Sequence, residues 1–113
     1  MLDNLKNLAN LPGIMAKAKQ MQDRMKQMQE ESASKQVSAD AGGGMVTAIV
    51  NGQMQLIKVR IDKSKVDVND VEMLEDLIIA AVSAAQVKAA EMMKEEMAKI
   101  ANEIGLPPGM LPG

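Results

Sequence analysis

The sequence predicts an α+β fold in which a three-stranded antiparallel meander lies between two long helices, in the order α-β-β-β-α. Apolar residues recur every three or four positions in both outer parts of the chain, which is the helical period. Between these parts β-branched residues cluster and the helical spacing disappears. Turn signals divide this middle stretch into three short strands. With 113 residues, the chain is expected to form one domain over residues 14–105, between an N-terminal segment (1–13) and a Pro/Gly-rich tail (106–113).

The first long helix is predicted to start after Pro12 and Gly13. Its apolar residues repeat in steps of four and three, the heptad pattern of a helix that packs along a seam: Ile14, Ala18, Met21, Met25 and Met28. Upstream, Leu2, Leu5, Leu8 and Leu11 can form a short extra helical turn or fray. Residues 1–13 are therefore set apart as a segment that is expected to be flexible.

The glycine run Gly42 to Gly44 is predicted to join a short strand around residues 36–40 to a strand that starts at Met45. A phosphate-binding loop would need a helix after it and a Gly-Lys-Ser/Thr ending, and this run has neither. The run is therefore interpreted as a turn.

Asn51-Gly52 is the dipeptide that a two-residue type I′ hairpin prefers, because both turn positions need a positive φ. Such a turn would set Val50 opposite Gln53 and Val46 opposite Ile57. Both faces of the resulting sheet carry apolar residues near the turn, so a helix or a second subunit is expected to cover the second face. The candidate residues for a dimer interface on that face are Ile49, Met54 and Leu56.

The second helix is predicted to run from about Asp70 to about Asn102. Asn69 can cap it, with Glu72 three residues later as in a capping box. Gly105 is placed to end it. One face carries its apolar stripe: Leu74, Ile78, Ala81, Ala85, Ala89, Met93, Met97, Ile100 and Ile104.

The composition excludes several classes of function. Without His or Cys the chain lacks the residues of common zinc sites, thiol nucleophiles and Ser-His pairs, so no enzyme, cofactor or metal is expected, nor a small-molecule substrate. Without aromatic residues it lacks the stacking platforms of RNA-binding sheets and single-strand binders. Neither a secretory signal nor an apolar stretch of membrane-spanning length is present, so a cytoplasmic protein without a membrane partner is expected.

Several stretches taken together resemble one family. They are "AKAKQMQDRMKQMQEE" in the first helix, "GGGMVTAIVNGQMQLIKVRID" over the strands, "EMLEDLIIAAVSAAQVKA" in the second helix and "GLPPGM" near the end. Over roughly residues 14–110 they resemble the YbaB/EbfC family of small bacterial nucleoid-associated proteins. The resemblance implies a cytoplasmic, nucleoid-located homodimer of α-β-β-β-α subunits with tweezers-like helical arms. It implies double-stranded DNA as the partner, with roles in nucleoid organisation, gene regulation and DNA protection.

The resemblance supplies no crisp set of DNA-contacting residues, so candidates are chosen by charge. The first helix holds Lys17, Lys19, Arg24 and Lys26 against Asp23, a local charge of +3 in a chain of net charge −2. From the residues alone, the solvated flank of a coiled coil is favoured over a phosphate-contacting stripe. The resemblance reverses that preference. Weaker candidates are Lys58, Arg60 and Lys88.

Two hypotheses of different classes follow. The first is a dimer that binds double-stranded DNA through its phosphates and alters its conformation. The second is a coiled-coil interaction module, or clamp, for protein partners that does not bind DNA. The acidic pI of about 5.1 and the methionine-rich seam suit the second hypothesis.

Overall fold

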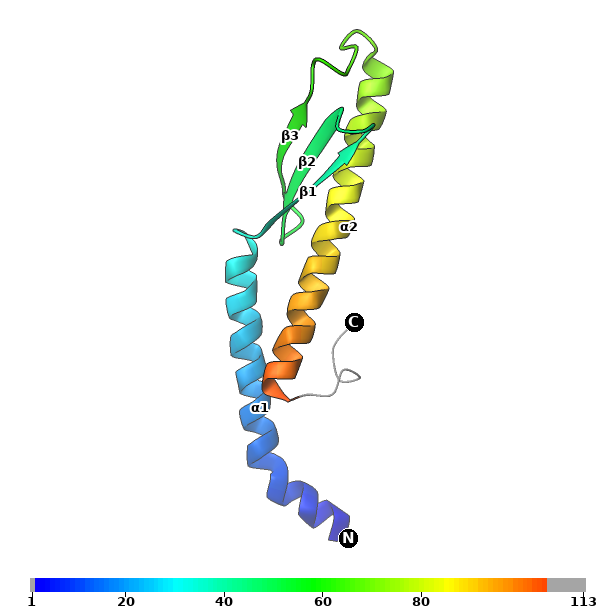
Figure 1. The fold of residues 1–113 in the computed structure, drawn as a ribbon. Coiled ribbons are helices and arrows are strands. Elements are labelled where there is room, and N and C mark those ends of the chain that lie inside the picture. The colour runs from blue at the N-terminus through cyan, green and yellow to red at the C-terminus, as the bar shows by residue number, and fades with distance from the viewer. Residues whose placement is uncertain (1, 106–113) are drawn as a thin grey trace. The chain divides into compact units, whose positions relative to one another are not determined.

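The computed structural model describes residues 2–105, with side chains from Leu11 onward, and its element order confirms the predicted α-β-β-β-α fold (Figure 1). Helix α1 is Leu2–Ser32 and helix α2 is Val71–Ile104. The strands are β1 (Gln36–Ala41), β2 (Val46–Asn51) and β3 (Leu56–Ile61). They form one antiparallel sheet in the order β1-β2-β3. The predicted tail, residues 106–113, lies outside the described residues.

The chain falls into two compact units. Gln29–Glu95 contains the whole sheet with most of α2. The described parts of Met1–Met28 and Glu96–Gly113 contain most of α1 with the end of α2. The predicted domain boundaries of 14 and 105 remain a prediction.

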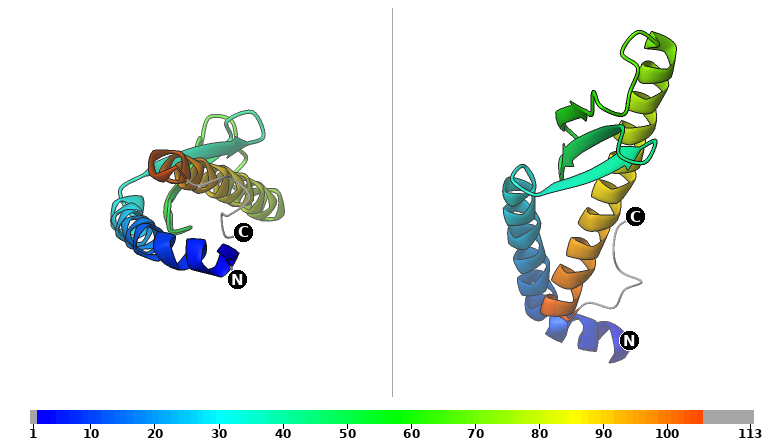
Figure 2. Two further views of the ribbon diagram at one scale, coloured as in Figure 1. Left: turned by 90° about the horizontal axis from the view of Figure 1, so that it is seen from below. Right: turned by 45° about the horizontal axis from the view of Figure 1, so that its top comes forward.

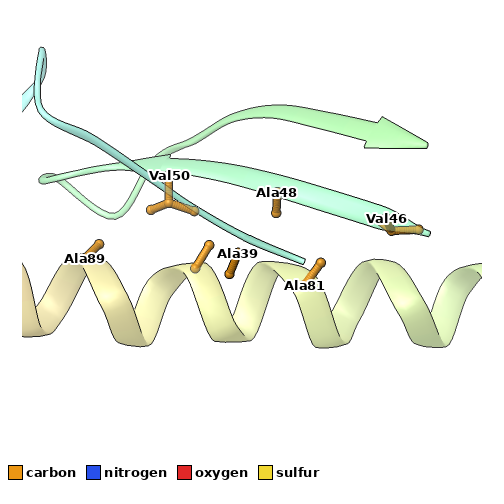
Figure 3. Close-up of a cluster of buried hydrophobic side chains, with 7 residues drawn as sticks. Ala39, Val46, Ala48, Val50, Ala81 and Ala89 are labelled. Atoms are coloured by element: carbon orange, nitrogen blue, oxygen red, sulfur yellow. The ribbon is translucent and has the colours of Figure 1, made fainter. Parts of the chain in front are cut away.

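In the unit Gln29–Glu95 the sheet lies along one side of α2 (Figures 1 and 2). Strand β2 turns Val46, Ala48 and Val50 toward the helix, and all three are fully buried (Figure 3). The helix meets them with the alanines Ala81, Ala85 and Ala89, one turn apart and also fully buried. Because alanine carries only a methyl group, the helix backbone can approach the sheet closely there. The predicted apolar stripe of α2 is thus the stripe that faces the core.

The β2–β3 connection differs from the predicted two-residue turn. Val46 pairs with Ile61 and Ala48 with Val59, while Val50 is opposite Leu56 after a bulge between Ile49 and Val50. The turn spans residues 52–55, between the end of β2 and the start of β3. The predicted register is therefore wrong by four residues at Val46 and Ala48, and by three at Val50, beyond the bulge. Because four is an even number, Val59 and Ile61 still share a face with β2's buried residues, as the alternation predicted.

The physical reason for the longer turn is the buried side chain of Asn51. Its Oδ1 accepts hydrogen bonds from the backbone N–H groups of Gln53 (2.9 Å) and Gln55 (3.0 Å). Its Nδ2 donates to Gln55 Oε1 (2.8 Å) and to the carbonyl of Ala33 (3.3 Å). The residue with a positive φ in this turn is Met54 (64°), and Gly52 has none. Asn51 therefore organises the turn through its side chain instead of a left-handed backbone.

The glycine run is a turn between strands, as predicted. Gly42, Gly43 and Gly44 have φ values of 64°, 65° and 92°, a region that side chains disfavour. The segment leads directly into β2. Lys65 Nζ donates to the carbonyl of Gly43 at 3.4 Å, which links this turn to the one after β3.

Helix α1 begins at Leu2 and continues through Pro12, so its predicted start after Gly13 is wrong. Proline inside a helix removes one backbone hydrogen bond and crowds the preceding turn, which bends the axis. Figure 1 shows α1 bending in its first third. Of the two options for the upstream leucines, helix is therefore the one observed.

The two helices also pack together in the unit that contains Met1–Met28 and Glu96–Gly113. On α1 Met28 is buried and Met21 and Met25 are half-buried. On α2 the buried residues are Ile100, Ala101 and Ile104. The predicted seam of α1 is thus buried at its C-terminal end, while Ile14 and Met15 near its start remain 57% and 63% exposed.

The cap of α2 lies one residue later than predicted. Asp70 Oδ1 accepts a hydrogen bond from the N–H of Met73 (3.2 Å), so Asp70 and not Asn69 is the N-cap. Glu72 consequently occupies a position without the capping-box geometry. At the other end Gly105 adopts φ 81° and ends the helix, as predicted.

Candidate nucleic-acid interface

Three lysines of α1 are exposed, on more than one side of the helix. Lys17, Lys19 and Lys26 are all exposed. Lys19 and Lys26 are one heptad apart, so they lie on the same side of the helix. Among the described residues, neither of these two amines has a carboxylate partner. Lys19 and Lys26 are therefore accessible cations on one side of α1.

Arg24 differs from these lysines, because its guanidinium already binds a carboxylate. Arg24 Nε and Nη2 both donate to Glu103 Oε2 of α2, at 3.1 and 2.8 Å. Nη1 donates to Gln27 Oε1 at 2.7 Å. A phosphate would have to compete with Glu103 for this group. The structure therefore gives Arg24 a role in joining α1 to α2, which charge counting could not anticipate because Glu103 is 79 residues away.

Lys58 and Arg60 lie on the outer face of the sheet. Their partners on β2 are Ile49 and Thr47, which alternate with the buried residues that face α2. Both cationic side chains are exposed. Neither has a carboxylate partner among the described residues. They are the most accessible cations on this sheet.

Lys88 is engaged within the fold. Its Nζ donates to the backbone carbonyl of Ser38 on β1 at 3.0 Å. This bond occupies a carbonyl on an outer strand of the sheet, and lysines at such edges hinder pairing with another strand. Lys88 is therefore a weaker phosphate ligand than its exposed position suggests.

The turn after β3 holds two further lysines that were not chosen from the sequence. Lys63 and Lys65 are exposed and flank Ser64. Asp62 accepts hydrogen bonds from Ser64 Oγ (2.6 Å) and Ser64 N–H (3.0 Å), and these bonds lower the pKa of its carboxyl group. The signal that could have found this turn is the alternation of cations in "KVRIDKSK", residues 58–65.

The candidate interface residues are accessible to different degrees. Ile49 is half-buried on the outer face of the sheet. Met54 is 39% exposed in the turn, and Leu56 is 47% exposed at the start of β3. Ile57, beside Leu56, is also 47% exposed. Three large apolar side chains close together in the sequence, Met54, Leu56 and Ile57, are thus exposed at this end of the sheet.

Among the side chains that the structure describes, residues 11–105, no three acidic, His or Cys groups come together as a metal-binding group. Over the same residues, neither long helix has the length and apolarity that crossing a bilayer requires. Glu72 lies in the first turn of α2, where an acid is favoured by the positive end of the helix dipole.

Comparison with known proteins identifies relatives over most of the chain. A "Nucleoid-associated protein" of Syntrophobacter fumaroxidans is 48% identical over 99 residues, covering 88% of this chain and 90% of that protein. A relative of the same description from Thermoanaerobacter pseudethanolicus is 47% identical over 98 residues, covering 87% and 88%. A crystal structure of an uncharacterized protein from Helicobacter pylori superposes with a TM-score of 0.56 at 25% identity, covering 66% of this chain and 87% of that one.

The model of one protein family matches nearly the whole described chain. Residues 6–104 match the YbaB/EbfC DNA-binding family. The match extends upstream of residue 14, where the resemblance began, and so includes residues 6–11 of α1, which precede Pro12. The resemblance noted in the sequence is confirmed, and this chain belongs to the YbaB/EbfC DNA-binding family.

Proposed function

We propose that this protein is a nucleoid-associated protein that binds double-stranded DNA as a homodimer, mainly through phosphate contacts, and alters the conformation of the DNA. Its roles would be nucleoid organisation, gene regulation and DNA protection, in the cytoplasm. The observation that carries the proposal is the match of residues 6–104 to a DNA-binding family. The relatives' descriptions as nucleoid-associated proteins point the same way.

The residues proposed to contact DNA from α1 are Lys17, Lys19 and Lys26. They are exposed on one helix, and their amines act as point charges that attract phosphate oxygens without reading bases. The chain has only two arginines, and Arg24 is bound to Glu103. Bidentate recognition of guanine, which uses mostly arginine, therefore has few available groups. Binding should depend weakly on DNA sequence and strongly on salt.

The proposed dimer would bring two such helices to one duplex. The apolar group formed by Met54, Leu56 and Ile57 supports an interface at this end of the sheet, because exposed apolar clusters favour burial by a partner. Six lysines from two chains would neutralise up to six phosphates. The logarithm of the association constant should then fall with the logarithm of the salt concentration with a slope of up to about −5.

Fluorescence anisotropy of a labelled duplex, titrated with protein over a salt series, tests the proposal. Lys19→Ala combined with Lys26→Ala should flatten the slope by up to about 4 in a dimer and weaken binding similarly on unrelated duplexes. Lys94→Ala combined with Lys99→Ala removes the same charge from α2, where glutamates surround both lysines, and should change the slope much less. Wild-type binding that does not respond to salt would contradict phosphate contact.

The alternative function is a clamp for protein partners. The observation that favours it is the exposure of the apolar residues Ile14 and Met15 on α1. A wild-type protein that is dimeric but does not bind any duplex at low salt would select this alternative.

A further inference from the structure

We infer that strand β3 and the turn after it form a second site for DNA phosphates, separate from the lysines of α1. The site, called here the β3 strip, consists of Lys58, Arg60 and Lys63. The inference rests on the proposed DNA binding and adds a contact surface to it. Residues 56–66 carry four cations and one acid, the same excess of positive charge that α1 carries around its lysines. The strip lies in the unit Gln29–Glu95, whereas the α1 lysines belong to the other unit.

The backbone of β3 fixes the spacing of Lys58 and Arg60. Residues two apart on a strand point to the same face and lie about 6.6 Å apart, because each residue advances the strand by about 3.3 Å. That spacing is comparable with the separation of neighbouring phosphates along one nucleic-acid strand. Two cations on one face of a strand can therefore contact consecutive phosphates, and the exposed Lys63 follows in the turn after β3.

The surroundings of the strip are free of competing carboxylates at close range. The cross-strand neighbours of Lys58 and Arg60 are Ile49 and Thr47, which carry no charge. The acid on the same face, Asp40, pairs with Thr47 and so lies two strands from Arg60, about 10 Å away. Asp62 is engaged by Ser64. The Thr47 hydroxyl lies beside Arg60 and is of the type that commonly donates to phosphate oxygens.

The strip is also held in place before any ligand binds. Strand β3 is paired with β2 along its length. The following turn is closed by hydrogen bonds from Asp62 N–H to the carbonyl of Met45 (2.9 Å) and from Lys65 N–H to the carbonyl of Asp62 (3.0 Å), and Val66 anchors it in the core. A fixed backbone reduces the ordering cost of binding. Lys65 is left out of the strip because its amine contacts Gly43.

A second copy of the chain could instead supply acids to these cations, since Glu72, Glu75 and Asp76 are exposed on α2. The charge pattern favours phosphate as the partner of these cations. Cations spaced along a strand match the linear array of phosphates in nucleic acid better than they match a patch of acids on a helix. Loss of the cations would then affect DNA affinity, while the association of subunits would not change.

The test is Lys58→Ala combined with Arg60→Ala, in the full-length chain. In the salt-series anisotropy experiment, the slope of the logarithm of the association constant against the logarithm of the salt concentration should be flattened by up to about 4 in a dimer. The affinity at 50 mM salt should be reduced at least about tenfold on every duplex. Lys58→Arg combined with Arg60→Lys keeps both charges and should retain wild-type slope. The double variant Lys94→Ala with Lys99→Ala is the control for net charge, and thermal unfolding with sedimentation equilibrium checks fold and mass.

The outcomes separate the two proposals. A wild-type protein that fails to bind DNA overturns the proposed function. In a second outcome, the wild-type protein binds DNA with an affinity that depends on salt, and the Lys58→Ala, Arg60→Ala variant shows the same affinity and slope. That result would overturn the β3 strip and leave the proposed function standing. If the salt slope of that variant is unchanged but its mass in sedimentation equilibrium falls from dimer toward monomer, the β3 strip is also overturned. These cations would then belong to contacts between subunits.

Discussion

At the scale of single residues, Asn51 and Gly52 show how one dipeptide can be a correct turn signal for an incorrect reason. The expected reason was a positive φ at both positions, and neither residue has one. Asn51 is needed for its amide, which bonds to four groups of the turn and of the preceding loop. Gly52 is needed for space. Its N–H donates to the carbonyls of Ser32 (2.9 Å) and Lys35 (3.0 Å), which draws the turn against the end of α1.

Gly52→Ala should therefore destabilise the fold more than Gly43→Ala. A Cβ at Gly52 would lie 2.9 Å from the Ser32 carbonyl oxygen, the Ser32 Cβ and the Met93 sulfur, so backbone must shift. Overpacking of this kind typically costs about 1–3 kcal/mol. Gly43 has nothing within 4 Å, and a Cβ there meets only the unfavourable φ of 65°, at a cost of about 1 kcal/mol.

Urea unfolding of both variants measures the difference in the free energy of unfolding. Asparagine, which tolerates a positive φ, separates the two causes. Gly43→Asn should be milder than Gly43→Ala, whereas Gly52→Asn should be worse than Gly52→Ala. Equal losses for the two alanine variants would contradict the conclusion that the close approach of Ser32 and Met93 is what requires glycine at position 52.

At the scale of elements, the alanines on the inner face of α2 allow this helix to pack closely against the sheet. Ala81, Ala85 and Ala89 contact the sheet where β2's valines fill the space, so large residues on the strand meet small residues on the helix. The sequence showed that these positions share a face, because they are spaced by four residues. That the face requires alanine, and not a larger apolar residue, follows from the closeness of the sheet.

Ala85→Leu should accordingly destabilise the protein by about 1–3 kcal/mol, because the added carbons have no space between helix and sheet. Ala84→Leu, one residue away on the exposed side of the same helix, should change stability by less than about 0.5 kcal/mol. Thermal unfolding followed by circular dichroism at 222 nm compares the two. A comparable loss for both variants would contradict the packing of α2 on the sheet through this face.

At the scale of the whole molecule, positive charge is concentrated in two segments of the chain, and one of them adjoins exposed apolar residues. The overall charge is −2, yet α1 and the β3 strip are each locally positive. The apolar side chains of Met54, Leu56 and Ile57 are exposed beside the strip. A small protein with little core area per residue commonly buries such a group by self-association.

The expected assembly is a homodimer that uses this apolar group. Leu56→Glu should weaken self-association, because it would place a carboxylate in an apolar contact. Sedimentation equilibrium should show wild-type protein at twice the chain mass of 12.1 kDa and a shift toward the monomer for Leu56→Glu. Val68→Glu, at an equally exposed apolar residue in the loop before α2, should leave the mass unchanged. A wild-type monomer at micromolar concentration would rule out the dimer.

The sequence by itself determined the order of the elements, the apolar stripe of α2 and the glycine turn before β2. These features depend on periodicity and on residues whose backbone preferences act locally, such as Gly42 to Gly44 and Gly105. The resemblance of several stretches of the sequence indicated the YbaB/EbfC family, and the match of residues 6–104 to that family confirms it.

Tertiary structure alone decided the features that depend on partners far apart in the sequence. Charge alone makes Arg24 a candidate for DNA contact, but its guanidinium forms an ion pair with Glu103. Charge likewise makes Lys88 a candidate, but its amine donates a hydrogen bond to the carbonyl of Ser38. The length of the β2–β3 turn was set by a buried amide. The register moved by four residues as far as the bulge, so Val59 and Ile61 kept their predicted face, whereas Leu56 is opposite Val50 beyond the bulge. Local preferences are encoded along the chain, whereas the partner of a side chain is fixed only when folding brings distant residues together.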